Sequence, residues 1–250
     1  MSQPSKCWVA NCVAREQALT RGFFLTGTDT SVGKTHVSGE LMRILAEEGF
    51  RVGGMKPVAS GADGVAGQWR NEDALVLQSR ASVELPYEWV NPYAFPQPIA
   101  PHLAALQAGV EICLETIVTQ FRKIETKVDC VVVEGAGGWL CPISPTLDIA
   151  DIARVLGLPV ILVVGMRLGC INHARLTDRL IRGSRVPYAG WVANDIDPLF
   201  TQRDETVETL TGFLGQKPLA EISFNAEFPG FDQGQNNHWN RGEILRRMLP

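Results

Sequence analysis

Several features that mark other classes of protein are missing from this sequence of 250 residues. No run approaches the roughly 18 consecutive apolar residues of a membrane span. No Lys- and Arg-rich stretch offers the basic face that nucleic acid requires, and the formal net charge is −4. The first residues lack the apolar core of a secretory signal, and they fit a transit peptide poorly. We therefore expect a cytoplasmic protein of small-molecule chemistry, with no nucleic-acid or membrane partner.

The six cysteines and four histidines follow no pattern that would cross-link the chain or bind zinc. No CxxC pair occurs, and neither residue type falls at zinc-ligand spacing. A chain of this length, with 45% hydrophobic residues, can bury a substantial core without disulfides. We predict reduced thiols in a globular protein.

Short apolar runs alternate along the chain with stretches of helical periodicity. Strands are predicted over residues 23–26, 51–55, 129–134, 159–165, 188–194 and 217–222. Helices are predicted over residues 34–48, 72–80, 112–125, 148–156, 172–183 and 201–214. The runs "VVVE" and "VILVV" are continuously apolar, as in strands that are covered on both faces. The alternation predicts a three-layer α/β fold, in which a mostly parallel sheet lies between helices.

No repeat, low-complexity tract or interdomain linker divides the chain. We expect one domain over residues 21–250, preceded by a loosely ordered extension over residues 1–20. Residues 82–102 carry five prolines, too many for a helix or a central strand. That segment is either a functional excursion or a plain surface loop. Residues 232–240 are expected to form a polar connector, and residues 241–249 a short final helix.

The stretch "GTDTSVGKT", residues 27–35, lies between a predicted strand and a predicted helix. Backbone N–H groups in such a loop converge on a phosphate, and the helix dipole adds positive potential. Lys34 can reach the terminal phosphates of a nucleotide, and the Thr35 hydroxyl can bind Mg²⁺. Gly27 and Gly33 enclose five residues, whereas the common pattern has four. The loop predicts a nucleotide-binding protein.

Three charged residues lie at the ends of predicted strands or at the start of a predicted helix. Lys56 follows the second strand on the ligand side of the sheet, although a solvated lysine before a proline is the alternative. Glu134 ends a buried strand, where an unpaired carboxylate is costly and a nearby Mg²⁺ would compensate it. Asp73 stands at a predicted helix start, where N-capping is the ordinary role of an aspartate. Glu134 is therefore the strongest metal candidate of the three.

Two further segments offer groups to a ligand. In "VGMRLGCINHARLT", residues 164–177, Gly169, Cys170 and Asn172 could present donors to an anion at a helix N-terminus. We do not predict a nucleophilic Cys170, because no His or acid is placed to activate it. Asn194 ends the next strand, where it can either bind a nucleobase edge or serve as a turn residue.

Together these motifs resemble the dethiobiotin synthetase family of P-loop NTPases. The resemblance covers about residue 21 to the end, and it rests on "GTDTSVGKT", "KPVASG", "RNEDA", "VNPY", "VEGAGGWLCPIS", "PVILVVGMRLGCINHARLT" and "GWVAND". The five-residue spacing of the glycine loop is the form found in this family. The resemblance implies a single-domain P-loop NTPase-type fold and a homodimer whose two active sites are shared between subunits.

The reaction implied by the resemblance is that of an ATP-dependent ligase in biotin biosynthesis. It converts 7,8-diaminononanoate (7,8-diaminopelargonate), CO₂ and MgATP to dethiobiotin, ADP and phosphate. One substrate amine captures CO₂ as a carbamate, whose oxygen attacks the γ-phosphorus of ATP. The second amine then attacks the carbonyl of the carbamic–phosphoric anhydride, expels phosphate and closes the ring.

The resemblance also assigns roles to residues. Lys34 and Lys56 would be catalytic, Thr35, Asp73 and Glu134 would surround Mg²⁺, and Ser60, Gly169, Cys170 and Asn172 would bind the diamine substrate. The residues implied to bind ATP are Thr30, Ser31, Val32, Gly33, Lys34, Thr35, His36, Asp73, Glu134, Gly135, Ala136, Gly137, Asn194, Asp195 and Ser223.

Two departures from the family pattern and two competing functions remain. Ala220 and Ser223 stand where Gly and Pro are common beside the adenine, which affects nucleotide affinity or base selectivity. Arg167 stands where a lysine is common, and either cation could hold a carboxylate. A partition-type switch ATPase usually has a second lysine in the glycine loop, where this chain has Asp29. A non-catalytic sensory domain of the same fold would have lost part of the catalytic set, which is complete here.

Overall fold

The computed structural model describes residues 21–65, 67–224 and 237–248, and the predicted extension over residues 1–20 lies outside them. A seven-stranded sheet, in the order β11-β10-β9-β8-β1-β7-β2, forms the centre of the described part. Its strands are β1 (Gly22–Gly27), β2 (Val52–Met55), β7 (Cys130–Gly138), β8 (Val160–Met166), β9 (Tyr188–Asp195), β10 (Ala220–Ile222) and β11 (His238–Trp239). Every neighbouring pair is parallel except β10 with β11. The predicted α/β fold with a mostly parallel sheet is confirmed.

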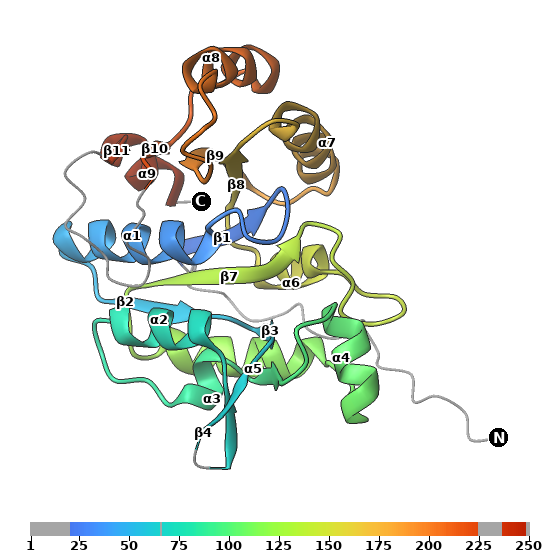
Figure 1. Ribbon diagram of the computed structural model, residues 1–250. Coiled ribbons are helices and arrows are strands. Elements are labelled where there is room, and N and C mark those ends of the chain that lie inside the picture. Colours follow the sequence, from blue (N-terminus) through green and yellow to red (C-terminus); the bar gives the residue numbers. More distant parts are fainter. Residues whose placement is uncertain (1–20, 66, 225–236, 249–250) are drawn as a thin grey trace.

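Helices cover both faces of this sheet (Figure 1). The described helices are α1 (Lys34–Glu47), α2 (Glu72–Arg80), α3 (Tyr87–Val90), α4 (Pro101–Ala108), α5 (Leu114–Glu125), α6 (Ile149–Leu156), α7 (Cys170–Gly183), α8 (Arg203–Leu214) and α9 (Arg241–Met248). Buried side chains of α1 and α9 belong to one core with the sheet, and those of α5, α6, α7 and α8 belong to the other. Helix α2 contributes Leu77 to the first core and Ala74 to the second. The predicted three layers are therefore present.

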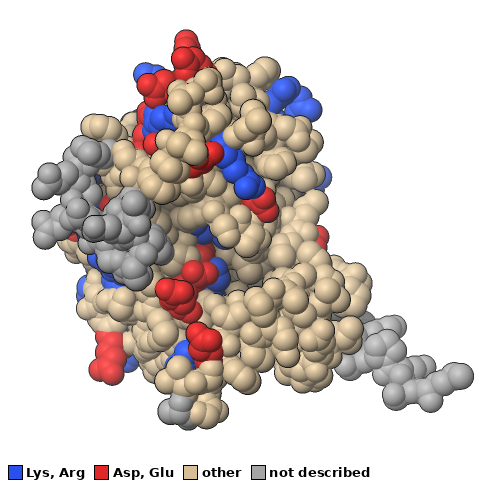
Figure 2. Space-filling model, viewed as in Figure 1, with Lys and Arg blue, Asp and Glu red and all other residues tan. Residues whose placement is uncertain are grey.

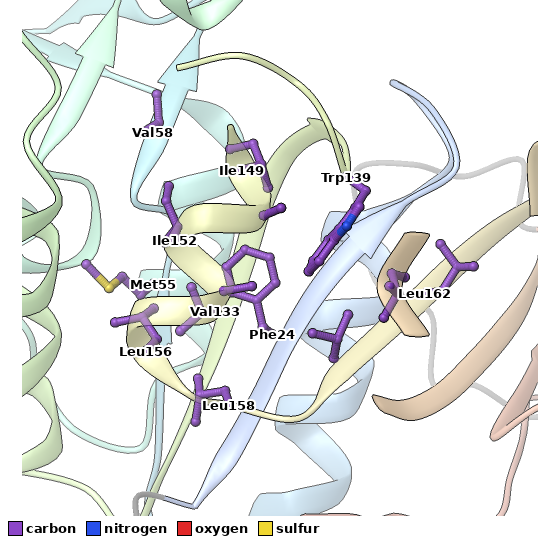
Figure 3. Packing of buried hydrophobic residues seen from close by; sticks show 14 of the residues in the cluster. Phe24, Met55, Val58, Val133, Trp139, Ile149, Ile152, Leu156, Leu158 and Leu162 are labelled. Atoms are coloured by element: carbon purple, nitrogen blue, oxygen red, sulfur yellow. The ribbon is translucent and has the colours of Figure 1, made fainter. Parts of the chain in front are cut away.

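Side-chain alternation along the strands divides the two cores. In β1, Phe23 and Leu25 point to the α1 side, whereas Phe24 points to the α6 side. Figure 3 shows Phe24 between Trp139, which follows β7, and the side chains of α6. Because successive strand residues point to opposite faces, a continuously apolar strand is buried on both sides. This packing holds the carboxyl ends of β1 and β7 close together.

Two small sheets lie beyond the β2 edge of the molecule. Strand β3 (Val58–Ser60) pairs in parallel with β6 (Tyr93–Phe95), and β4 (Asp63–Val65) pairs antiparallel with β5 (Gln68–Arg70). None of these three-residue strands is predicted from the sequence. They are too short to show a hydrophobic period, so their pairing depends on the neighbouring segments.

The proline-rich segment 82–102 contains more regular structure than predicted. It holds α3, β6 and the first two residues of α4, so the expectation that it excludes a helix is wrong. Pro86 is the residue before α3, and Pro101 begins α4, where the missing N–H of proline needs no partner. Its strand lies outside the central sheet, as the prolines predicted.

The end of the chain also differs in part from the expectation. Of the predicted polar connector 232–240, residues up to 236 lie outside the described residues, and His238 and Trp239 form β11. Pairing with Glu221 and Ala220 of β10 makes this pair a strand despite its polar surroundings. The final helix is confirmed as α9.

Within the described ranges, no helix has the length and apolar character needed to cross a bilayer.

Candidate active site

The loop between β1 and α1 has the geometry of a phosphate cradle. Gly33 has φ of +80°, in the left-handed region that favours glycine, and a Cβ there would lie 2.1 Å from Asn194 Nδ2. That Asn194 amide donates a hydrogen bond to the Val32 carbonyl over 2.8 Å. Ser31 also has a positive φ of 58°. Gly33 and Ser31 thus have backbone conformations in the left-handed region, and the hydrogen bond from Asn194 of β9 helps to hold the loop in this shape.

The ammonium group of Lys34 points back across this loop. Its Nζ donates a hydrogen bond to the Asp29 carbonyl at 3.0 Å, and the side chain is almost fully buried. Burial, followed by the charge of Lys56, lowers the pKa of Lys34 to about 8. A phosphate bound in the loop would restore the charged form, because an anion favours the ammonium.

Lys56, Glu134 and Asp73 meet beside the start of α1. Lys56 Nζ lies 2.5 Å from Glu134 Oε1, 3.0 Å from Asp73 Oδ2 and 3.3 Å from the carbonyl oxygen of Gly135. The Thr35 hydroxyl donates to the same Glu134 oxygen over 3.0 Å. Lys56 and Glu134 are buried, whereas the Asp73 side chain is 42% exposed. The structure therefore brings together Lys34 and the four polar residues predicted to handle phosphate and metal.

Electrostatics favour the charged forms of Lys56 and Asp73. Burial alone would lower the pKa of Lys56, but the charges of Glu134 and Asp73 outweigh it and raise that pKa above its usual value. Burial alone would raise the pKa of Asp73, but the charge of Lys56 and the hydrogen bond from the Thr35 hydroxyl outweigh it and lower that pKa below its usual value. Lys56 is therefore a fixed positive charge at neutral pH.

The donor set fits a magnesium ion. Glu134 Oε2 is fully buried and has no hydrogen-bond partner among the described residues, so one carboxylate oxygen is left unsatisfied. Thr35 and Asp73 supply further oxygens next to it. Oxygen ligands of this kind, combined with phosphate oxygens, are those that Mg²⁺ prefers.

Gly135, Ala136 and Gly137 continue β7 past Glu134. Gly137 has φ of +60°, and a Cβ on it would lie 3.0 Å from Cys141 Sγ and 3.8 Å from Thr30 Oγ1. A side chain there would enter the space between this strand end and the phosphate loop. The glycines thus leave the backbone of β7 open to a nucleotide, and that contact stays a prediction.

The loop after β8 lies against the phosphate loop. Arg167 Nη2 lies 2.6 Å from Asp29 Oδ2, and the Arg167 carbonyl accepts the N–H of Cys170 at the start of α7. Gly169 has φ of +93°, and Asn172 is exposed on the first turn. Burial raises the pKa of Cys170, which agrees with the prediction that it is not a nucleophile.

The residues predicted on the nucleotide-base side are more dispersed. Asn194 is buried, and its side-chain amide donates one hydrogen bond to the Val32 carbonyl of the phosphate loop. Asp195 is paired with Arg203 at 3.0 Å, and the Ser223 N–H donates to Asn237 Oδ1 at 3.2 Å. His36 is half-buried on the first turn of α1, where burial lowers its pKa. The contact of Asn194 with adenine, and the binding of ATP by His36, Asp195 and Ser223, stay predictions.

Ser60 lies at the end of β3, and its buried hydroxyl has no partner among the described residues. An unsatisfied buried hydroxyl is consistent with a substrate contact, which stays a prediction. Figure 2 shows acidic and basic side chains around a hollow in the middle of the face drawn there.

Four polar residues near the site were missed in the sequence. Asp29 accepts hydrogen bonds from the side chains of Lys34 and Arg167. A chain of hydrogen bonds that reaches the Lys56 carbonyl is formed by Asn71, Tyr87 and Asn91. A recognisable signal existed only for Asn71, which stands directly before a predicted helix and caps α2 through the Ala74 N–H.

Residues 21–229 match the family described as AAA domain. The ATP-dependent dethiobiotin synthetase BioD of Xanthomonas euvesicatoria pv. vesicatoria (strain 85-10) is 47% identical over 216 residues, which are 86% of this chain and 95% of that protein. The protein of the same name from Xanthomonas oryzae pv. oryzae (strain PXO99A) is 49% identical over 213 residues, 85% of this chain and 95% of its own. That of Xylella fastidiosa (strain 9a5c) is 47% identical over 188 residues, covering 75% and 83%.

Similar solved structures include more distant proteins. A ParA family ATPase from Chlorobium tepidum TLS has a TM-score of 0.53 at 15% identity, covering 83% of this chain and 86% of that one. The MinC:MinD cell division protein complex of Aquifex aeolicus gives 0.52 at 18% identity, covering 83% of each chain. Such distant likeness supports the fold alone. Nearly full-length relatives at almost half identity, together with the complete phosphate loop and its lysines, show that the chain belongs to the dethiobiotin synthetase family.

Proposed function

We propose that this protein is an ATP-dependent ligase that converts 7,8-diaminononanoate and CO₂ to dethiobiotin, with ADP and phosphate as the other products. The observation that carries the proposal is the convergence of two buried lysines, Lys34 and Lys56, on one phosphate loop. One cation can neutralise the phosphates of ATP, and the second can neutralise the oxygen that accepts the phosphoryl group.

The first step forms a carbamate. A neutral amine of the substrate attacks CO₂, a C–N bond forms, and the amine loses a proton. Lys56 is held in its charged form, so it can stabilise the negative carboxylate that results. The unpartnered hydroxyl of Ser60 is a second group that can bind this carbamate.

The second and third steps close the ring. A carbamate oxygen attacks the γ-phosphorus, the bond to the β-phosphate oxygen breaks, and ADP leaves while Lys34 balances the charge on the phosphates. The second amine then attacks the carbonyl of the mixed anhydride, and phosphate leaves with the carbamate oxygen. A proton is lost from the amine, and a five-membered cyclic urea remains.

Mg²⁺ is the cofactor that we propose, bound by Thr35, Asp73 and Glu134. When bound, it would neutralise negative charge on the phosphates during transfer. Lys56 satisfies Glu134 Oε1, and Oε2, which lacks a partner among the described residues, is available to a cation.

A homodimer with shared active sites is the proposed assembly. Leu168 is 90% exposed, and Leu176 and Leu180 of α7 are 54% and 46% exposed, so the loop with Gly169 begins an apolar surface. Mixing inactive Lys34→Ala and Asn172→Ala subunits tests the sharing, because a mixed dimer would contain one intact site. Recovery of about a quarter of the wild-type activity supports shared sites, and no recovery contradicts them.

We place the enzyme in the cytoplasm. Support comes from the thiols of Cys113, Cys130, Cys141 and Cys170, which are unpaired in the described part of the chain, as is usual in a reducing compartment. Cell fractionation with an antibody against the protein would test this location.

The reaction is tested by mass spectrometry of purified protein given diaminononanoate, ¹³C-bicarbonate and MgATP. One ¹³C in a product of dethiobiotin mass, formed one-to-one with ADP, would support both reaction and substrate. ADP released without that product would instead favour a switch ATPase, and no ADP at all would favour a non-catalytic sensory domain.

A further inference from the structure

A chain of buried hydrogen bonds joins the proline-rich segment to the charged cluster. We propose that Tyr87 and Asn91 are positioning residues that hold Lys56 and Asp73 in register with each other through Asn71. This role is additional to the chemical steps proposed above. One of its tests measures turnover and therefore rests on the proposed function. None of the three polar side chains takes part in the chemical steps described above.

The Lys56 end of the chain consists of backbone contacts. Asn91 Nδ2 donates to the Lys56 carbonyl at 2.6 Å and to the Tyr93 carbonyl at 3.2 Å. The Lys56 N–H in turn donates to the Val90 carbonyl at 2.8 Å. Both polar groups of the Lys56 backbone are therefore fixed by residues 90 and 91, which sets where its side chain begins.

The Asp73 end is reached through a tyrosine hydroxyl. Tyr87 donates to Asn91 Oδ1 at 2.9 Å and accepts the backbone N–H of Asn71 at 2.7 Å. Asn71 Oδ1 accepts the Ala74 N–H at 3.3 Å and so caps α2, whose first turn carries Asp73. One hydroxyl thus links the strand end that bears Lys56 to the helix start that bears Asp73.

Burial makes this link specific. The exposed fractions of Asn91, Asn71 and Tyr87 are 3%, 7% and 8%, so water has little access to replace a lost partner. A buried network whose donors and acceptors are paired favours a single geometry. Asn71 Nδ2 also lies 3.4 Å from the Ser60 carbonyl, which ties a third predicted site residue to the same network.

The variant Tyr87→Phe deletes only the central hydroxyl and unpairs the Asn71 N–H and Asn91 Oδ1. Tyr93→Phe is the matched control, because its hydroxyl accepts the Cys113 N–H before α5 at 2.9 Å and forms no hydrogen bond with Lys56 or Asp73 in the described part of the chain. Each variant loses one tyrosine hydroxyl from the same segment. A general loss of packing would therefore affect both alike.

For Tyr87→Phe we expect kcat to fall about tenfold or more, because a small displacement of a charged group is costly in catalysis. We also expect the Mg²⁺ concentration that half-saturates ATP binding, measured by calorimetry without diamine, to rise about threefold or more. Tyr93→Phe should keep both values within about twofold. Equal effects of the two variants, or an unchanged Mg²⁺ value in Tyr87→Phe, would overturn the proposal.

The calorimetric measurement also separates this proposal from the proposed function. A wild-type protein that binds MgATP but forms no dethiobiotin contradicts the function, while the comparison of Mg²⁺ values still tests the network. If Tyr87→Phe does not fold, Asn91→Ser is the second variant, because its short hydroxyl cannot reach both the Lys56 carbonyl and Tyr87. The same two changes are expected of it, and wild-type values would overturn the proposal.

Discussion

Two ion pairs border the phosphate loop and differ sharply in their surroundings. Lys56 and Glu134 pair with exposed side-chain fractions of 5% and 0%, whereas Arg167 and Asp29 pair with 41% and 48%. The nitrogen–oxygen distances are nearly equal, 2.5 Å and 2.6 Å. The two pairs therefore have similar contact distances, but the Lys56–Glu134 pair is shielded from water and the Arg167–Asp29 pair is largely exposed to it.

The difference teaches that burial, rather than distance, sets the consequence of losing a partner. Removing one member of a buried pair leaves an uncompensated charge, which costs about 3–5 kcal/mol of stability. An exposed pair contributes about 0–1 kcal/mol, because water solvates the remaining charge. We infer that the Lys56–Glu134 pair holds its two charges in the positions that catalysis requires. The Arg167–Asp29 pair mainly holds the loop after β8 against the phosphate loop.

Lys56→Ala should give the largest effect. We expect turnover to fall about 10²- to 10³-fold, as when one preorganised charge donor is lost. Without Mg²⁺ the free energy of unfolding should also drop by about 3–5 kcal/mol, because Glu134 is fully buried and loses its positively charged partner. Urea unfolding and initial rates measure the two effects, with exposed Lys127→Ala as the control. A Lys56→Ala enzyme of near-normal activity removes this lysine from the mechanism.

Glu134→Gln should rank next, since it keeps the shape of the side chain but removes its charge. The Mg²⁺ concentration needed for half-maximal activity should rise about tenfold or more. The loss of stability should be smaller than in Lys56→Ala, because Lys56 keeps Asp73 as a partner at 3.0 Å. An unchanged Mg²⁺ titration contradicts the metal role of Glu134.

Arg167→Ala should have a small effect on stability and tests the exposed half of the comparison. We expect the free energy of unfolding to change by less than about 1 kcal/mol, and the difference to vanish in about 1 M salt. Arg167→Ala, Asp29→Asn and the double variant form a cycle that isolates the pair. A loss as large as that of Lys56→Ala would show that exposure is a poor guide here.

The smallest effect is expected at a third pair, Arg51 with Asp129, remote from the phosphate loop. Hydrogen bonds from the Arg51 side chain and N–H lower the pKa of Asp129 to about 2 from 3.8. Because the folded-state pKa is lowered, this contribution to stability is complete above pH 3.8 and is lost as pH falls towards 2. Thermal melts should therefore separate wild type from Asp129→Asn at neutral pH and converge in acid. A constant difference at every pH would mean that packing, not charge, is responsible.

The central fold was predictable because its signals are local and strong. The apolar strands containing Val132 and Ile161 are buried on both faces, and helices α1 and α2 begin at the predicted residues. The strands β3 and β6 were missed, since three residues carry no readable period and gain their pairing from each other. The error at Pro101 arose because proline disrupts the inside of a helix but suits its first turn.

The sequence by itself determined the chemistry, because a glycine loop before a helix, a following Lys-Thr and a carboxylate at a strand end each predict a role from their own surroundings. Only the tertiary structure decided how those groups are held. It brought Lys56 and Thr35 to the same oxygen of Glu134, across separations of 78 and 99 residues. It also placed Tyr87 and Asn91 behind them. Contacts between residues so distant along the chain depend on packing of the whole sheet, which no local pattern encodes.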